Sequence, residues 1–133
     1  MKVFFTIGSM LISLIVLDLS WTGRLAKGFY ARHIGHFFAG HVSILPIMLF
    51  YILYTAGLYF FVVSPSLLAQ SSTVRVFFSG AFFGLVAYGT YDLVNQGLFK
   101  DWPIIVTVID MLWGMILTGL VSLAGVFASR ILG

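Results

Sequence analysis

The sequence predicts an all-α integral membrane protein with four transmembrane helices and a short amphipathic helix in the membrane interface between the first and the second. Hydrophobic residues make up 61% of the chain and charged residues 8%, whereas about a quarter of a soluble domain is charged. Four apolar stretches are each long enough to cross ~30 Å of hydrocarbon. We expect a single transmembrane domain, residues 1–133, with helices at about 3–21, 44–63, 76–98 and 103–132 and an interfacial connector at 22–43.

The composition also excludes several classes of function. The chain has no cysteine, which rules out disulfides, thiolate nucleophiles and cysteine-bound metals. Its seven Lys and Arg residues are scattered and form no basic run of the kind that binds nucleic acid. We therefore interpret them as interfacial anchors and topology signals in a lipid bilayer.

The first segment, residues 3–21, begins like a signal peptide, because Lys2 precedes an apolar run. Asp18 and Trp21 follow that run without a small-residue cleavage pattern, so we expect a retained membrane helix. Asp18 lies about one turn before the end of the segment. Its carboxylate either snorkels to the interface or reaches a neighbouring helix, and the segment alone is compatible with both.

The connector, residues 22–43, is too highly charged to span a membrane. Apolar and aromatic side chains such as Tyr30, Ile34 and Phe37 fall within about 100° on a helical wheel, which indicates a short helix lying in the interface. Its charged and imidazole side chains that we expect at the rim of a site are Arg24, Lys27, Arg32, His33 and His36.

Two of these histidines are spaced as metal ligands can be. His33 and His36 stand at i and i+3, so their imidazoles share a helical face. Interfacial histidines on an amphipathic helix are commoner than metal ligands. We therefore predict no metal site, and the sequence indicates no particular cofactor.

The second segment, residues 44–63, contains no charged residue and carries Pro46 in its first turn, where a missing amide proton costs little. We expect this helix to be the most exposed to lipid. A polar turn at residues 64–73 then returns the chain across the membrane.

The third segment, residues 76–98, has two different halves. Gly80 and Gly84 form a G-x-x-x-G spacing that lets another helix approach closely, either within the chain or in a homodimer. The second half carries four polar side chains that we expect on one helical face: Tyr88, Tyr91, Asp92 and Asn95. An ionised carboxylate inside a bilayer costs at least ~2.5 kcal/mol, so this face should meet protein or a wet cavity.

The fourth segment, residues 103–132, follows a tight turn in which Asp101 is placed to cap the helix. Asp110 and Trp113 lie two to three turns inside it. Three small residues then recur at four-residue spacing and form either an internal packing seam or a homodimer face: Gly114, Thr118 and Ser122.

Four crossings place the polar ends of segments one, three and four on one side of the membrane, within about 6 to 13 Å of its surface. We expect a one-sided pocket there, formed by Asp18, Trp21, Tyr88, Tyr91, Asp92, Asn95, Asp110 and Trp113. An Asp-x-x-Trp pattern occurs twice, as Asp18 with Trp21 and as Asp110 with Trp113. In each, the Asp and Trp share a helical face, so the indole N–H can donate to the neighbouring carboxylate. Because three carboxylates in a low dielectric should not all ionise, we predict that at least one is protonated at neutral pH.

Several short motifs carry a family resemblance across nearly the whole chain. They are Leu17-Asp18-x-x-Trp21-x-Gly23, Gly28-Phe29-Tyr30, Ala87-Tyr88-x-Thr90-Tyr91-Asp92-Leu93-x-Asn95, and Trp102-Pro103 through Asp110-x-x-Trp113-Gly114. The chain thereby resembles a family of small bacterial four-helix membrane proteins catalogued as domain of unknown function 2177. The resemblance implies a bacterial cytoplasmic-membrane protein and brings no activity or ligand. The chain departs from the family pattern at Gln96-Gly97.

Three functions fit this pattern. The pocket binds or modifies the polar end of a lipid-like amphiphile, it serves a proton- or cation-coupled small transporter, or its polar groups tie helices together and dock a partner protein. We favour the first, because one polar pocket near a membrane face suits an amphiphile. The connector side carries four basic residues against three on the other side, which favours a cytoplasmic pocket.

Overall fold

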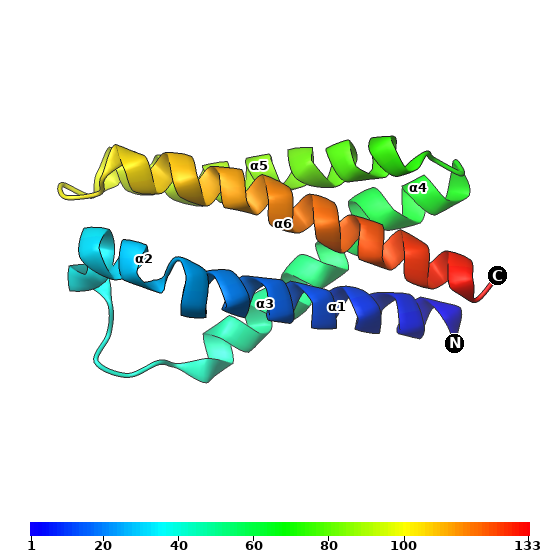
Figure 1. The fold of residues 1–133 in the computed structure, drawn as a ribbon, viewed down its shortest axis with the longest axis horizontal. Helices are drawn as coiled ribbons and strands as arrows, with labels where there is room; N and C mark the ends of the chain where they lie inside the picture. Colours follow the sequence, from blue (N-terminus) through cyan, green and yellow to red (C-terminus); the bar gives the residue numbers. More distant parts are fainter.

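The computed structural model describes all residues from Met1 to Gly133 and contains only helices and their connections. Four helical stretches are long and apolar enough to cross a membrane, which confirms the predicted fold class (Figure 1). The elements are α1 (Lys2–Ser20), η1 (Trp21–Leu25), α2 (Lys27–Ile34), η2 (Gly35–Phe37), α3 (Ile44–Leu58), η3 (Tyr59–Val63), α4 (Ser64–Leu68), α5 (Thr73–Leu98) and α6 (Ile104–Ile131).

The spans differ from the prediction mainly at their ends. The first continues through the wider turn η1 to Leu25, and the second continues through η3 and α4 to Leu68. The prediction of a polar turn from residue 64 was wrong, because Pro65 stands in the first turn of α4, where its missing N–H is tolerated. The return is confined to a few residues around Gln70, whose φ is 50°. Asp101 does not cap α6, which begins after Pro103 without a side-chain cap.

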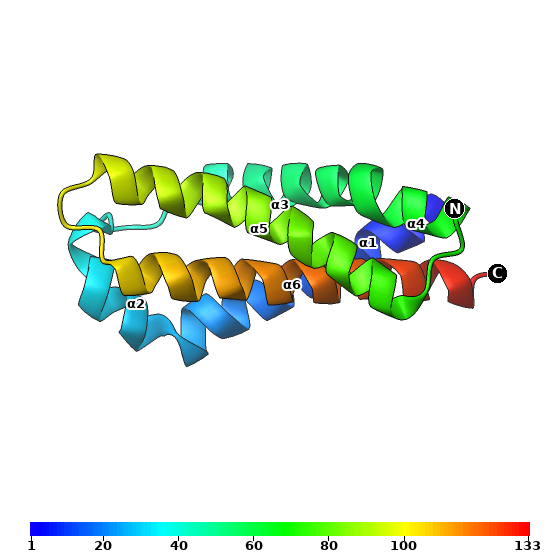
Figure 2. The same cartoon turned by 90° about the horizontal axis from the view of Figure 1, so that it is seen from above.

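Helices α5 and α6 lie side by side in two perpendicular views and form the closest helix pair (Figures 1 and 2). A Cβ added at Gly84 would meet the Gly114 carbonyl and the Thr118 hydroxyl, and one added at Gly80 would meet Ser122. Both small-residue seams therefore pack against each other within the chain.

The apolar core occupies the half of the bundle that lies toward the chain termini. Helix α1 packs on α6, and the second span joins them through α3 and η3. The largest fully buried side chains there include Met10, Leu14, Leu58 and Leu117. A smaller share of the first span is buried than of the second, so the expectation that 44–63 is the most lipid-exposed helix was wrong.

The connector closes the opposite end of the bundle. Tyr30 and Ile34 of α2 are buried and pack with Trp102 and Val106 at the start of α6. The charged face of the connector stays exposed, as an amphipathic interfacial helix requires. Helix α2 is thereby held over the ends of α1 and α6, where two of the three intramembrane aspartates lie.

Candidate functional site

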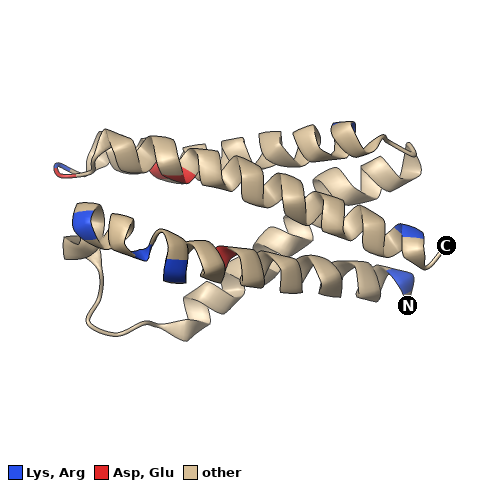
Figure 3. Cartoon of the chain, in the orientation of Figure 1, with Lys and Arg blue, Asp and Glu red and all other residues tan.

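The three intramembrane aspartates lie at the connector end of the bundle, on three different helices. Asp18 is on α1, Asp92 on α5 and Asp110 on α6, each six or seven residues from the connector end of its span, or about 9 to 10.5 Å by helical rise. Red segments mark acidic residues inside α1 and α6 in Figure 3. Asp18 and Asp110 line the same cavity, and Asp92 lies near Asp110. The chain therefore assembles a carboxyl cluster with Asp110 at its centre.

Asp18 faces a second-span tyrosine. The Tyr51 hydroxyl donates a hydrogen bond of 2.7 Å to one Asp18 carboxyl oxygen. The indole N–H of Trp113 on α6 faces the same carboxyl group, although it has no hydrogen-bond partner of its own. Asp18 thus turns toward neighbouring helices and does not snorkel to the interface, which answers the question that its segment left open.

Asp110 is reached from the connector. The Tyr30 hydroxyl donates to an Asp110 oxygen at 2.8 Å and accepts from the Trp21 indole nitrogen at 3.0 Å. The Trp21 and Trp113 rings stack at 4.7 Å with an interplanar angle of 12°. The expected pairing of each tryptophan with the aspartate of its own helix is therefore crossed: Trp113 faces Asp18, and Trp21 leads through Tyr30 to Asp110.

Of the three residues in this series of hydrogen bonds, only Tyr30 lies outside the membrane-spanning helices. Burial raises the pKa of its hydroxyl above the usual value, and the negative charge of Asp110 raises it further. The tyrosine consequently stays protonated and remains a donor to the Asp110 carboxylate over the ordinary pH range.

Asp92 is fully buried, and neither of its carboxyl oxygens has a hydrogen-bond partner. The four side chains predicted to form one polar face of α5 do not all point to the same place. Tyr88 packs against Gly114 and meets Tyr54 edge-on at 6.3 Å, whereas Tyr91 is 56% exposed and meets Trp102 at 5.9 Å. Asn95 is half-buried and lines no cavity at this end. The face divides because only one side of α5 packs against α6.

Two cavities adjoin at the cluster, and they share Thr22, Tyr91 and Asp110. The first, about 430 Å³, lies between all four spans; its other lining residues are Asp18, Phe50, Tyr54, Ala87 and Tyr88. The second, about 410 Å³, lies beneath the connector and includes Lys27, Tyr30 and Trp102. Asp92 lines neither cavity and stands behind Asp110. The first cavity combines a mainly apolar wall with two carboxyl groups, which accept hydrogen bonds from a hydroxyl or amine.

Most of the expected rim residues lie elsewhere. Lys27 lines the second cavity, but Arg24, Arg32, His33 and His36 line neither. The His33 Nδ1–H donates to the Phe29 carbonyl at 2.8 Å, and the His36 ring packs on Phe37 at 4.2 Å. No three His, Asp or Glu side chains converge in an arrangement that could hold a metal ion.

Sequence reasoning missed the hydroxyl groups that complete the cluster. Tyr30 and Tyr51 bind the aspartates directly, and the Tyr54 hydroxyl meets the Thr118 hydroxyl at 2.7 Å. The sequence did contain a signal for these hydroxyl groups, because Tyr51 and Tyr54 share a helical face of a segment that has no charged residue. Tyrosine in a membrane span is amphipathic, so two at this spacing indicate a polar neighbour.

Gln96 stabilises the turn between α5 and α6. Its side-chain amide donates to the Trp102 carbonyl at 2.7 Å and accepts from the Thr107 hydroxyl at 2.7 Å. The Trp102 indole in turn donates to Thr107 at 3.1 Å. This closed network holds the start of α6, and with it Asp110, at a fixed distance from α5.

The fold and this cluster define a class: a small membrane protein of four spanning helices whose acidic groups gather at one end. The chain belongs to the family described as predicted membrane protein (DUF2177), whose model matches residues 3–127. No curated protein and no solved structure matches the chain.

Proposed function

We propose that the protein binds the polar end of a lipid-like amphiphile in the first aspartate cavity. The observation that carries this proposal is the lining of that cavity, a mainly apolar wall that holds the carboxyl groups of Asp18 and Asp110. Carboxyl groups in such a setting favour a ligand that brings its own donors, a hydroxyl or an amine, because the ligand then replaces lost hydration.

The tail of the amphiphile would leave between α3 and α5. The second span contacts α5 mainly through η3, at the end of the bundle away from the cavity. At the cavity end, α3 packs chiefly on α1. Phe50 of α3 and Tyr91 of α5 both border the cavity and are both exposed. The side of the cavity between them is the exit that we propose toward the lipid acyl chains.

Modification of the bound polar end would use the same carboxyl groups. We assign Asp92, which is fully buried and has no hydrogen-bond partner, as the group that would exchange a proton with Asp110. A proton or cation pathway across the membrane is less well supported. The termini half of the bundle contains the apolar core with Leu14, Leu58 and Leu117, and no Asp or Glu side chain lies in it.

We further propose that the protein resides in the bacterial cytoplasmic membrane with the aspartate end facing the cytoplasm. The family resemblance supports the first part of this proposal. The basic residues of the connector support the second, because cytoplasmic loops carry an excess of Lys and Arg.

Native mass spectrometry of the protein released gently from membranes tests the binding proposal. We expect a specific bound mass on the wild type that is lost in Asp18→Asn and in Asp110→Asn. Asp101→Asn is the matched control, because Asp101 is an exposed carboxylate in the turn before α6. Bulk phospholipid bound equally to all four proteins would contradict the proposal, and proton flux in liposomes that Asp92→Asn abolishes would favour transport.

A further inference from the structure

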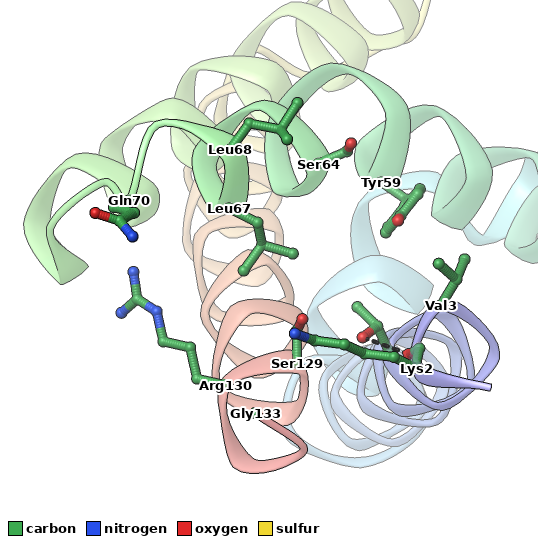
Figure 4. Close-up of a pocket in the computed structure, with 11 residues that line it drawn as sticks. Lys2, Val3, Tyr59, Ser64, Leu67, Leu68, Gln70, Ser129, Arg130 and Gly133 are labelled. Atoms are coloured by element: carbon green, nitrogen blue, oxygen red, sulfur yellow. Dashed lines mark hydrogen bonds between the residues drawn. The ribbon is translucent and has the colours of Figure 1, made fainter.

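A third cavity lies at the opposite end of the bundle, where both chain termini meet (Figure 4). Its volume is about 640 Å³, larger than either aspartate cavity. The start of α1, the η3–α4 junction, the turn after α4 and the end of α6 form its walls. Nothing in the proposed function uses this cavity, which lies on the far side of the apolar core from the carboxyl cluster.

The charge of this cavity is opposite to that of the aspartate cluster. Lys2 and Arg130 both line it; its other lining groups are uncharged side chains and the main chain at Gly133, the last residue. Figure 3 shows basic residues and no acidic ones on the ribbon near the two termini. Two cations that share a cavity repel each other unless an anion lies between them. The arrangement therefore favours an anionic occupant.

One of the two cations is already held in place. A terminal guanidinium nitrogen of Arg130 donates to the Ser71 carbonyl at 2.7 Å. A guanidinium has five N–H donors in a rigid fork, so the others remain for a ligand. In Figure 4 the Arg130 side chain extends toward Gln70, and the Lys2 side chain extends across the opening toward Ser129. Further donors come from the hydroxyl groups of Tyr59, Ser64 and Ser129, which also line the cavity.

The position of the cavity points to the ligand class. Lys2 is the first residue of the first span and Arg130 is the last but one of the fourth, so both lie at the level of lipid headgroups. Leu68 and Val3 border the same cavity and are 85% and 49% exposed, which places an apolar surface beside the cations. Phosphate is the anion found at this depth, and Arg together with Lys is a common way to bind it.

We propose that this cavity binds a phosphate group, with Lys2 and Arg130 as its two cationic contacts. The phosphate belongs either to the headgroup of an anionic phospholipid or to a free phosphate at the membrane surface, and both would use the same donors. The protein would then hold two chemically different polar groups at its two ends: a hydrogen-bond donor at the aspartates and a phosphate at the termini.

Lipid titrations followed by native mass spectrometry test this proposal. The purified full chain, freed of its tag, is titrated with phosphatidylglycerol, with diacylglycerol of the same acyl chains, and with inorganic phosphate. We expect phosphatidylglycerol to bind specifically and diacylglycerol not to bind. Lys2→Gln and Arg130→Gln should each weaken phosphatidylglycerol binding by about tenfold or more, as the loss of a charge-assisted hydrogen bond implies.

Arg75→Gln is the matched control, because Arg75 is an exposed arginine at the same end that does not line the cavity. Lys2→Gln keeps the test independent of the Arg130 contact with Ser71, whose loss could loosen the turn. Inorganic phosphate that binds with the same dependence on Lys2 and Arg130 would assign the site to free phosphate. Equal binding of phosphatidylglycerol and diacylglycerol, or an equal effect of all three substitutions, would overturn the proposal.

Discussion

Replacing Tyr30 by Phe is the sharpest perturbation of the carboxyl cluster. The change removes one hydroxyl oxygen and keeps the ring, which is 8% exposed and packs with Trp102 and Val106. That single oxygen donates to Asp110 at 2.8 Å and accepts from Trp21 at 3.0 Å. Its loss leaves two half-buried polar groups on different spans, the Trp21 indole and the Asp110 carboxyl group, without their partner.

The expected cost follows from these two bonds. Interhelical hydrogen bonds within membranes average ~0.6 kcal/mol, which gives a lower limit of about 1 kcal/mol for the pair. In a water-excluded protein site a neutral bond contributes roughly 0.5 to 1.5 kcal/mol and one to a charged group roughly 1.5 to 3, which gives an upper limit of about 4.5 kcal/mol. Tyr30 lies outside the spans but is buried, so we expect Tyr30→Phe to destabilise the fold by 2 to 3 kcal/mol, roughly the middle of this range.

Reversible unfolding of the purified protein in mixed detergent, followed by tryptophan fluorescence, measures this cost. The stacked pair Trp21 and Trp113 lies next to the perturbed bond and should report on it. A double-mutant cycle with Asp110→Asn isolates the coupling of Tyr30 to that carboxyl group. Tyr59→Phe, at the opposite end of the bundle, is the control and should change stability little. A cost below about 0.5 kcal/mol for Tyr30→Phe, or no coupling in the cycle, would refute the hydrogen-bond chain.

Three further predictions follow. Because the pKa of Tyr30 is raised in the folded state, the stability that its hydroxyl contributes is complete below about pH 10 and is lost as the pH rises further. In unfolding curves measured at alkaline pH, the wild type should therefore lose more stability than Tyr30→Phe. Parallel losses in the two proteins would contradict this prediction. Gly84→Ala should destabilise the protein by about 1 to 3 kcal/mol, because the new Cβ meets the α6 backbone, whereas Gly97→Ala, with open space around it, should be neutral or stabilising in the same assay. Since the chain has no cysteine, single cysteines at Gly40 and Gln70 should label only from the cytoplasmic and the opposite side, respectively; the reverse result would invert the proposed orientation.

The fold could be predicted from the sequence because hydropathy and helix length determine it. An apolar run that crosses a bilayer must satisfy its backbone internally, so a helix is the only local solution. An even number of crossings then fixes which ends meet, and helical rise brings Asp18, Asp92 and Asp110 to similar depth. Connectivity therefore predicts that the carboxyl groups gather at one end of the bundle.

The hydrogen-bond partners of the aspartates could not be predicted in the same way. Helical spacing correctly places Trp21 and Trp113 beside Asp18 and Asp110 on their own helices, but the indole groups turn to the neighbouring helix. That choice depends on how α1 and α6 are rotated about their axes, which packing decides. The tyrosine donors come from α2 and α3, and no local pattern links them to a carboxyl group far along the chain.

The cavity at the termini was missed for a different reason. Lys2 and Arg130 stand near opposite ends of the sequence, and each alone is an ordinary interfacial anchor. The even number of crossings already places both on one membrane side. Only the packing of α1 on α6 brings them into one cavity.

Filling the first aspartate cavity without touching a carboxyl group tests the central claim most directly. Ala87 lines that cavity, and Ala87→Phe would occupy the space proposed for the ligand. Ala56→Phe, on the exposed surface of α3, adds the same apolar side chain outside it. In native mass spectrometry we predict that the bound amphiphile is lost from Ala87→Phe and retained by Ala56→Phe. An amphiphile retained by a folded Ala87→Phe protein would show that the aspartate cavity is not where it binds.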